Sequence, residues 1–338
     1  MSKARELAQK PNQPTGRKNL IINGAMNVAQ RGTSSTGITS IGYDTVDRMK
    51  TEMGDVGTVQ LTMEQSTDAP AGFSNSAKYT VTTADTSASA NFYCRMTQHI
   101  EAQDLQHLSF GTSDAKSLTL SFWVKASIAG TYTIRLRTPD TTTRHYTVEY
   151  IISSANTWEY KTISVVGDAS ATINNDNGSG FIAHWWLDAG STRKDGVSNQ
   201  WEDSDGNSVS TNQVALTATT NATWQVTGVQ LEVGTVATEF EHLSYGEEFI
   251  NCERYYSERM LAVETPYVSG SGKYYHSVFN WTPMRTAPSV GITNGSLSLV
   301  ATTAAYNITT TGCRIECQSS GSGRSFNLGG TIKMSAEL

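Results

Sequence analysis

Alternation of apolar and polar residues with a period of two is the feature that most constrains the fold of this chain. In the segment 117–127 every second residue is apolar, so an extended backbone would place all apolar side chains on one face. The apolar positions are Leu118, Leu120, Phe122 and Val124, and the intervening positions are Thr119, Ser121, Trp123 and Lys125. The alternation resumes after Gly130 in residues 132–137, so the two runs predict a β-hairpin.

Short alternating segments recur from residue 20 to residue 234, separated by clusters of Gly, Asp, Asn and Ser. Only 17% of the residues are charged, which favours many short strands over long solvated helices. Roughly ten strands in this span predict an all-β fold, a jelly-roll β-sandwich. The predicted strands are 47–53, 59–65, 77–83, 92–100, 117–127, 132–137, 146–152, 158–166, 181–187, 213–219 and 224–233.

The rest of the chain flanks this sandwich, which we assign to residues 19–243. Residues 1–18 predict a short N-terminal helix with Ala4, Leu7 and Ala8 on one face, followed by a linker. Two turns of helix are marginally stable alone, so this segment is either an attachment peptide or a frayed terminus.

Beyond the sandwich, residues 244–262 form a connector with mildly helical spacing of its apolar residues. Residues 263–338 predict a small C-terminal β domain with strands at 274–279, 289–292, 296–302, 312–317 and 331–336. The domain is poor in large aliphatic residues, so we expect a partner chain to complete its core.

The net charge and the spacing of the cysteines limit which kinds of partner and ligand we expect for this chain. A net charge of −6 provides no basic field for nucleic acid, and no apolar run is long enough for membrane insertion or a signal peptide. We therefore expect synthesis and folding in a cytoplasm. The four scattered cysteines predict free thiols, and neither a cofactor nor a metal is expected. The run Asp203–Asn207 could open a calcium loop, but an ordinary Asp-Gly turn is the favoured interpretation.

Three stretches of the sequence together resemble bacteriophage virion fibre proteins. They are Asn19–Met26 with Gln30–Gly32 and Asp47–Arg48, then Leu120–Ser127, and then Val226–His242, which continues into Ser244–Glu248 and Arg254–Tyr256. The third stretch is similar to the closing strand of a carbohydrate-binding-module-like jelly roll. The resemblance implies a homotrimer, a virion-bound N-terminal segment that docks on other virion proteins, and a C-terminal module that faces the host.

The expected function is therefore that of a phage virion structural protein, a tail fibre or fibre-like component that attaches to host surface glycans. Its location would be the virion, after synthesis in the host bacterial cytoplasm. No nucleophile elbow, zinc-protease helix or phosphate loop is present in the sequence, so we expect no enzyme activity. The alternatives are a connector, collar or head-decoration protein that binds only virion proteins, and a polysaccharide depolymerase.

Exposed aromatic rings are the residues expected to bind a glycan, because they stack on sugar faces. On the outer faces of predicted strands, Trp123 and Trp186 would join Arg135, Arg137 and His184 in one patch if their strands share a sheet. The alternative is that a neighbouring subunit or a loop covers these rings. The candidate glycan-binding residues are Trp201, Trp123, Trp186, Tyr274, Tyr275 and Trp281, and those assigned to the core are Trp158, Trp185 and Trp224.

Overall fold

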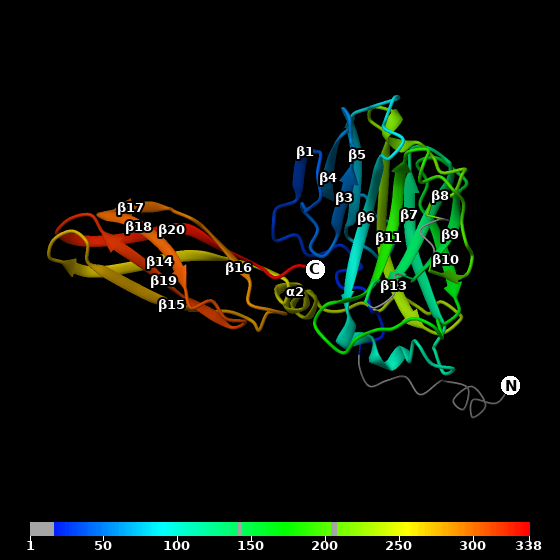
Figure 1. Cartoon of the computed structure of the whole chain (residues 1–338). Coiled ribbons are helices and arrows are strands. Elements are labelled where there is room, and N and C mark those ends of the chain that lie inside the picture. The colour runs from blue at the N-terminus through cyan, green and yellow to red at the C-terminus, as the bar shows by residue number, and fades with distance from the viewer. Residues whose placement is uncertain (1–16, 141–143, 204–207) are drawn as a thin grey trace.

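The computed structural model describes residues 17–140, 144–203 and 208–338. Figure 1 shows a broad β-sandwich from which a slender second β domain extends, with helix α2 between the two. This architecture confirms the predicted all-β, jelly-roll class. Ala4, Leu7 and Ala8 of the predicted N-terminal helix lie outside the described residues, as do residues 204–207 of the predicted Asp-Gly turn, whose alternative interpretation was a calcium loop.

Two antiparallel sheets form the sandwich. The six-stranded sheet has the order β1 (Ser34–Ile38), β4 (Gln60–Ser66), β5 (Ser76–Thr83), β13 (Thr223–Val233), β7 (Leu118–Ala126) and β10 (Glu159–Val165). The seven-stranded sheet has the order β12 (Trp201–Glu202), β9 (Arg144–Ile152), β8 (Gly130–Thr138), β11 (Ser179–Ala189), β6 (Tyr93–Glu101), β3 (Lys50–Gly54) and β2 (Gly42–Tyr43). Two 3₁₀ turns, η1 (Ala102–Leu108) and η2 (Leu216–Ala218), complete this region.

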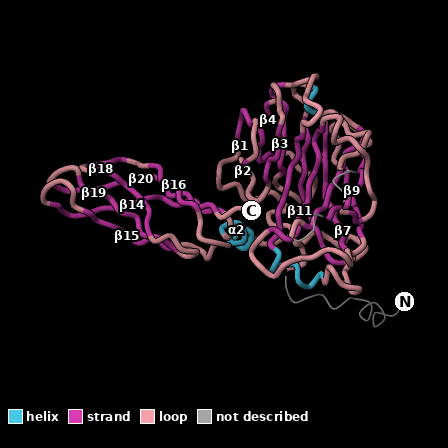
Figure 2. The backbone as a smooth tube through the Cα atoms, viewed as in Figure 1, coloured by secondary structure: helices cyan, strands magenta, loops and turns pink. Residues whose placement is uncertain are grey.

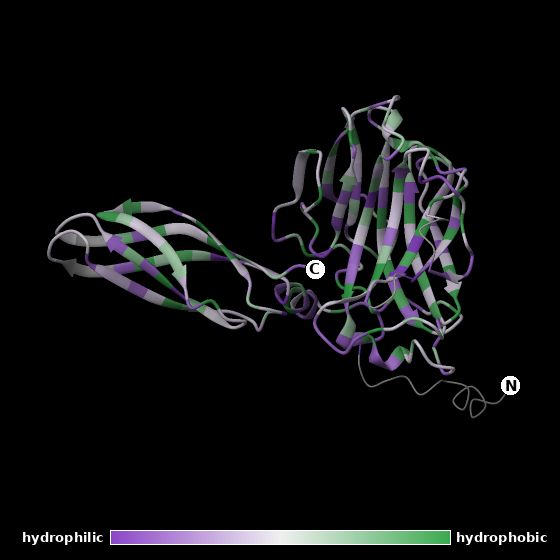
Figure 3. Cartoon of the chain, in the orientation of Figure 1, coloured by the Kyte–Doolittle hydropathy of each residue, from purple (hydrophilic) through white to green (hydrophobic). Residues whose placement is uncertain are grey.

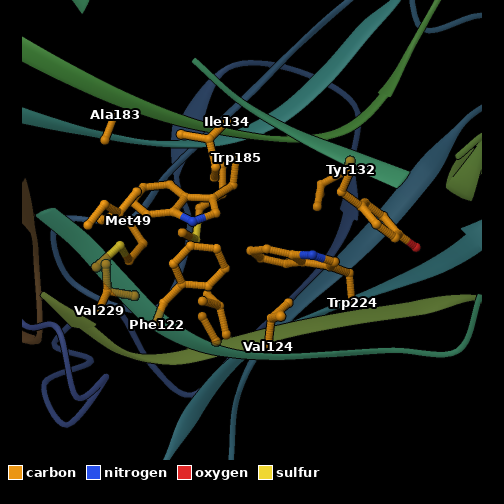
Figure 4. Close-up of a cluster of buried hydrophobic side chains, with 14 of the residues drawn as sticks. Met49, Phe122, Val124, Tyr132, Ile134, Ala183, Trp185, Trp224 and Val229 are labelled. Carbon is orange, nitrogen blue, oxygen red and sulfur yellow. The ribbon is translucent and has the colours of Figure 1, made fainter. Parts of the chain in front are cut away.

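The core lies between the two sheets, and the strands alternate in hydropathy along their length (Figure 3). Phe122 of β7 meets Trp185 of β11 edge to face, with ring centroids 6.2 Å apart. In Figure 4 these rings and Trp224 fill the centre of the cluster, and the Trp224 Nε1–H donates to the Tyr150 hydroxyl at 3.1 Å. The core assignment is confirmed for Trp185 and Trp224. It is wrong for Trp158, whose half-buried ring lies on the outer face of the six-stranded sheet.

The predicted hairpin of residues 117–137 is wrong. Strand β7 pairs with β10 and β13, whereas β8 pairs with β9 and β11, so the turn before Gly130 carries the chain from one sheet to the other. Alternation defines the apolar face of each run, and both faces do reach the core, but from opposite sides. The predicted strand 213–219 is also wrong, since Asp188 accepts hydrogen bonds from the Thr217 N–H and hydroxyl and η2 forms there.

Helix α2 (Tyr245–Glu253) opens the connection to the second domain and starts at a capping box. The Ser244 hydroxyl accepts from the Glu247 N–H, and the Glu247 carboxylate accepts from the Ser244 N–H. Among the described residues no helix is long and apolar enough to cross a bilayer (Figure 2 shows how short the helices are).

The C-terminal domain is a small two-sheet sandwich. One sheet contains β14 (Tyr256–Val268), β20 (Gly323–Ser335) and β16 (Ser289–Thr293), with β17 (Ser296–Ser298) pairing to β20. The other contains β15 (Tyr274–Asn280), β19 (Gly312–Ser319) and β18 (Val300–Tyr306). Strand β14 already begins at Tyr256, inside the range given to the connector. The buried residues between the sheets are Leu261, Val263, Trp281, Met284, Cys313, Ile315, Cys317, Ile332, Met334 and Ala336.

A buried cluster, which we call the joint, fastens this domain to the sandwich. The Arg48 guanidinium lies over the Tyr255 ring at 3.5 Å and forms an ion pair with Glu337. Arg31 lies over the Tyr256 ring at 3.6 Å and also pairs with Glu337, at 3.1 Å. Burial opposes the charge on Arg48, but the Glu337 carboxylate raises the Arg48 pKa above its ordinary value. The joint therefore holds both ends of the C-terminal domain, Tyr255–Tyr256 at its start and Glu337 at its end, against the sandwich.

Segments that carry the sequence resemblance meet at and around the joint. The Glu241 carboxylate accepts from the Asn19 N–H at 2.6 Å, and Glu248 accepts from the Asn23 N–H at 2.7 Å. Gln30 donates to the Tyr256 carbonyl at 2.8 Å. Residues far apart in the sequence thus connect the sandwich, α2 and the C-terminal domain.

Candidate functional site

The outer-face residues predicted to form one patch lie on two different sheets. Trp123 belongs to β7 of the six-stranded sheet, while Arg135, His184 and Trp186 belong to the seven-stranded sheet. The single patch therefore does not exist. Trp186 is 0% exposed, packed with Val209 of the following loop and with the Arg95 guanidinium 4.9 Å from its ring, so it offers no face to a sugar.

Trp201 packs against the edge of the core. Its ring contacts Phe110, Phe181 and Tyr146 at centroid distances of 5.8, 6.2 and 5.8 Å. Its Nε1–H donates to the Val166 carbonyl at 2.7 Å. The ring is half-buried and its Nε1–H has an acceptor, which fits a structural role for Trp201 at the start of β12.

The three C-terminal candidates are spread along β15 and the residue that follows it. Tyr274 is 63% exposed and opens β15, just after the turn that follows β14. Tyr275 is half-buried against the core of the domain. Trp281 is 8% exposed and donates to the Thr310 carbonyl at 3.0 Å. At about 3.3 Å per residue, Tyr274 and Trp281 are separated by roughly 20 Å, so they cannot share one sugar ring.

Trp123 does contribute to a site, together with a residue that the sequence analysis did not select. Strands β7 and β10 pair so that Tyr160 lies directly opposite Trp123, and their ring centroids are 5.3 Å apart. Tyr160 is 44% exposed. Both rings stand on the outer face of the six-stranded sheet because their strand neighbours, Phe122 and Ile163, face the core.

Three further rings stand opposite this pair. Phe73 comes from the β4–β5 connection, and Phe240 and His242 come from the segment that follows β13. Ring centroids lie 5.0 Å apart for Phe73–Phe240, 5.3 Å for Phe73–His242 and 4.8 Å for Phe240–His242. Packing of the three rings on one another holds this wall in place.

Between the two sets of rings lies a surface groove of about 280 Å³, which we call the aromatic groove. Small residues make room for it. Gly228 has a φ of +60°, and a Cβ there would lie 2.6 Å from the Phe73 ring, so only glycine fits. The groove is lined by Ala71, Gly72, Phe73, Ser121, Trp123, Tyr160, Gly228, Thr238, Glu239, Phe240 and His242.

Polar side chains flank the aromatic groove on the same face. Asp68 forms an ion pair with Lys125 and accepts from the Trp158 Nε1–H at 3.2 Å. The hydrogen bond from Lys125 lowers the pKa of the Asp68 carboxyl. Lys125 also lies 5.1 Å from the centre of the Trp158 ring, so Trp158, Lys125 and Asp68 form one supported cluster beside the groove.

The sequence contained a partial signal for this site. Trp158 and Tyr160 are two residues apart and therefore share a strand face, and Gly228 interrupts the alternation of β13 where the pairing with β7 shifts. Nothing in the local sequence brings Phe73 and Phe240 to the same place, because their contact depends on chain segments more than 160 residues apart.

No family model and no curated protein match this sequence. Among solved structures, the enzymatically active domain of bacteriophage CBA120 tailspike protein 4 is similar with a TM-score of 0.33 and 12% identity, over 64% of this chain and 21% of that chain. A family 4 carbohydrate-binding module gives a TM-score of 0.30 and 12% identity, over 63% and 98%. The module TmCBM61 in complex with β-1,4-galactotriose gives 0.30 and 11%, over 64% and 100%. This chain thus spans about a fifth of the tailspike domain's length.

Proposed function

We propose that this chain is an attachment protein of a bacteriophage particle and that it binds a host surface glycan in the aromatic groove. The observation that carries the proposal is the pair of aromatic walls, Trp123 with Tyr160 and Phe73 with Phe240 and His242, around a groove of about 280 Å³. Aromatic faces pack on the C–H faces of sugars, and flanking polar groups orient the hydroxyls.

A place on the virion and a homotrimeric state belong to the same proposal. They are supported by the resemblance of the segments around the joint to phage fibre proteins. One groove of this size would bind weakly, but several copies on one particle would raise the avidity by the local concentration of sites. In this proposal the N-terminal residues 1–18 dock on other virion proteins.

We further propose that the groove binds without cleaving. Glycoside hydrolysis in most families requires two carboxyl groups about 5 to 9.5 Å apart. Among the described residues that line the groove, Glu239 alone carries a carboxyl group. This arrangement supports adhesion over depolymerisation.

Binding of the purified full-length protein to host cells and to extracted surface polysaccharide tests the proposal. Tyr160→Ala removes one groove wall, and Tyr274→Ala removes another exposed tyrosine at the far end of the molecule as the matched control. We expect a loss of at least about tenfold in affinity for Tyr160→Ala, corresponding to about 1.4 kcal/mol, and none for the control.

Other outcomes separate the alternatives. Loss only in Tyr274→Ala would move the receptor site to the C-terminal domain. Absence of binding by the folded wild-type protein would favour a connector, collar or decoration protein of the virion. Release of reducing sugar from the polysaccharide would favour a depolymerase.

A further inference from the structure

The charges around the aromatic groove are unevenly distributed. Of the described residues that line it, Glu239 bears a carboxylate and is exposed, while none is a lysine or an arginine. The histidine His242, which also lines the groove, is exposed. An incoming ligand therefore meets a negative charge and no permanent positive charge.

Two lysines that lie beside the groove already have partners within the protein. Lys125 is paired with Asp68, which leaves that pair without net charge. The Lys18 ammonium donates to the Thr238 hydroxyl and the Glu239 carbonyl, both at 2.6 Å. These hydrogen bonds to neutral oxygens leave the charge of the ammonium in place. The Thr238 hydroxyl also donates to the Glu232 carboxylate at 2.6 Å and the Lys18 N–H donates to Glu241 at 3.0 Å, so two carboxylates of the protein already lie beside this cation.

Positive charge is concentrated instead on the outer face of the other sheet. Arg95 forms a short ion pair with Glu52 at 2.7 Å, and Lys50 lies 3.5 Å from the same carboxylate. Lys50 also donates to an oxygen of Leu338 at 3.3 Å. The two faces of the sandwich therefore differ in kind: one is aromatic and carries a carboxylate, and the other is rich in cations.

We infer that the aromatic groove selects uncharged glycans and excludes sugars that carry carboxylate, phosphate or sulfate groups. The inference rests on the proposed function, glycan binding in this groove. An anionic sugar would bring its charge towards the Glu239 carboxylate without gaining a cation from the residues that line the groove, and like charges repel at short range. A neutral sugar can donate its hydroxyls to Glu239 and stack its ring on Tyr160 or Trp123.

The test uses the full-length protein and host polysaccharide separated by anion exchange into neutral and acidic fractions. Part of the acidic fraction is treated chemically so that its carboxylates become primary alcohols, which removes the charge and keeps the sugar ring. The measured quantity is the part of the binding that Tyr160→Ala abolishes. We expect this binding with the neutral and the carboxyl-reduced fractions, and at least tenfold weaker binding with the untreated acidic fraction.

Glu239→Lys provides a second arm. It reverses the charge inside the groove, so we expect at least a tenfold gain in binding of the acidic fraction at low salt. Glu64→Lys is the matched control, because Glu64 lies on β4 of the same sheet, outside the groove, and the substitution changes the net charge equally. Tyr160-dependent binding of the acidic fraction at least as strong as that of its reduced form would overturn the inference. If no fraction binds, the proposed function itself fails.

Discussion

The sandwich and the C-terminal domain are both two-layer β structures, but they bury their residues very differently. The sandwich encloses large aromatic side chains such as Trp185, Trp224 and Phe122 between sheets of six and seven strands. The C-terminal domain encloses Trp281 and a few smaller residues between sheets of four and three strands, and it exposes Met260 and other apolar side chains. We infer that the sandwich is stable through its own core, whereas the C-terminal domain depends on the joint.

The largest expected effect is that of Trp224→Ala. Loss of a fully buried indole should lower the free energy of unfolding of the sandwich by about 3–5 kcal/mol. Chemical denaturation, followed with probes in each region, would measure it. Trp281→Ala is the counterpart in the C-terminal domain and should shift only the transition of that domain. A single shared transition for both variants would show that the two regions unfold as one unit.

The next effect concerns the joint. Glu337→Ala leaves the buried Arg48 without its ion-pair partner and should destabilise the attachment of the C-terminal domain by about 3 kcal/mol. Limited proteolysis of the segment around α2 would detect the opening. Glu258→Ala breaks a more exposed pair with Lys333 and should cost at most about 1 kcal/mol. If the Glu337→Ala and Glu258→Ala variants resist proteolysis equally, the joint does not stabilise the domain.

Acid should also distinguish the two regions, because it should lower the stability of the sandwich more than that of the C-terminal domain. Burial lowers the pKa of His184 well below its ordinary value of 6.5, and nearby Arg95 and Arg137 act in the same direction. Burial also lowers the pKa of His99. Below pH 6.5 these two histidines therefore become protonated in the unfolded chain while they remain neutral in the folded protein. Proton binding favours the unfolded state, so the stability of the sandwich falls as the pH falls.

A carboxylate extends this acid sensitivity. Burial opposes the charge on Glu52, but His99, 3.7 Å away, and the Arg95 guanidinium, 2.7 Å away, lower its pKa overall. Its contribution is present above the ordinary value of 4.5 and is lost as the pH falls below it. Thermal unfolding between pH 7 and about pH 3 would measure both effects, and His184→Gln should flatten the upper part of the curve. The C-terminal transition should change less, because its one histidine, His276, is exposed, and a flat sandwich curve would contradict this account.

The smallest effect is expected at Met260, which is 71% exposed on β14. In an isolated chain Met260→Thr should change the free energy of unfolding by no more than about 0.5 kcal/mol. In a homotrimer that covers this residue, the loss would be larger and would depend on protein concentration. Unfolding measured at two protein concentrations separates these cases.

Sequence alternation predicted most of the strands, because a half-buried strand must place every second side chain in the core. It assigned Leu120 and Phe122 to the core and Trp123 to the outer face correctly. It could not tell that β7 and β8 belong to different sheets, since strands of opposite sheets point their apolar faces to the same core.

The aromatic groove could not be predicted from local sequence patterns, for a related reason. Only Trp123 was selected from the sequence, and Trp158 was placed in the core although it shares a face with exposed Tyr160. The opposite wall forms where Phe73 and Phe240 meet across the sheet, with Gly228 beneath them. Such a site requires knowledge of strand order, which periodicity does not supply.

The joint has a mechanical consequence. Strands β14 and β20 each run without interruption from the joint to the far loops of the C-terminal domain, and they pair along almost their full length. A pull on those loops would therefore be carried by two covalent backbones in parallel, and neighbouring strands would not be sheared past each other. The weakest point under tension would be the non-covalent contacts of Tyr255 and Glu337 at the base of the domain. The joint should therefore open before the strands of the domain separate from one another.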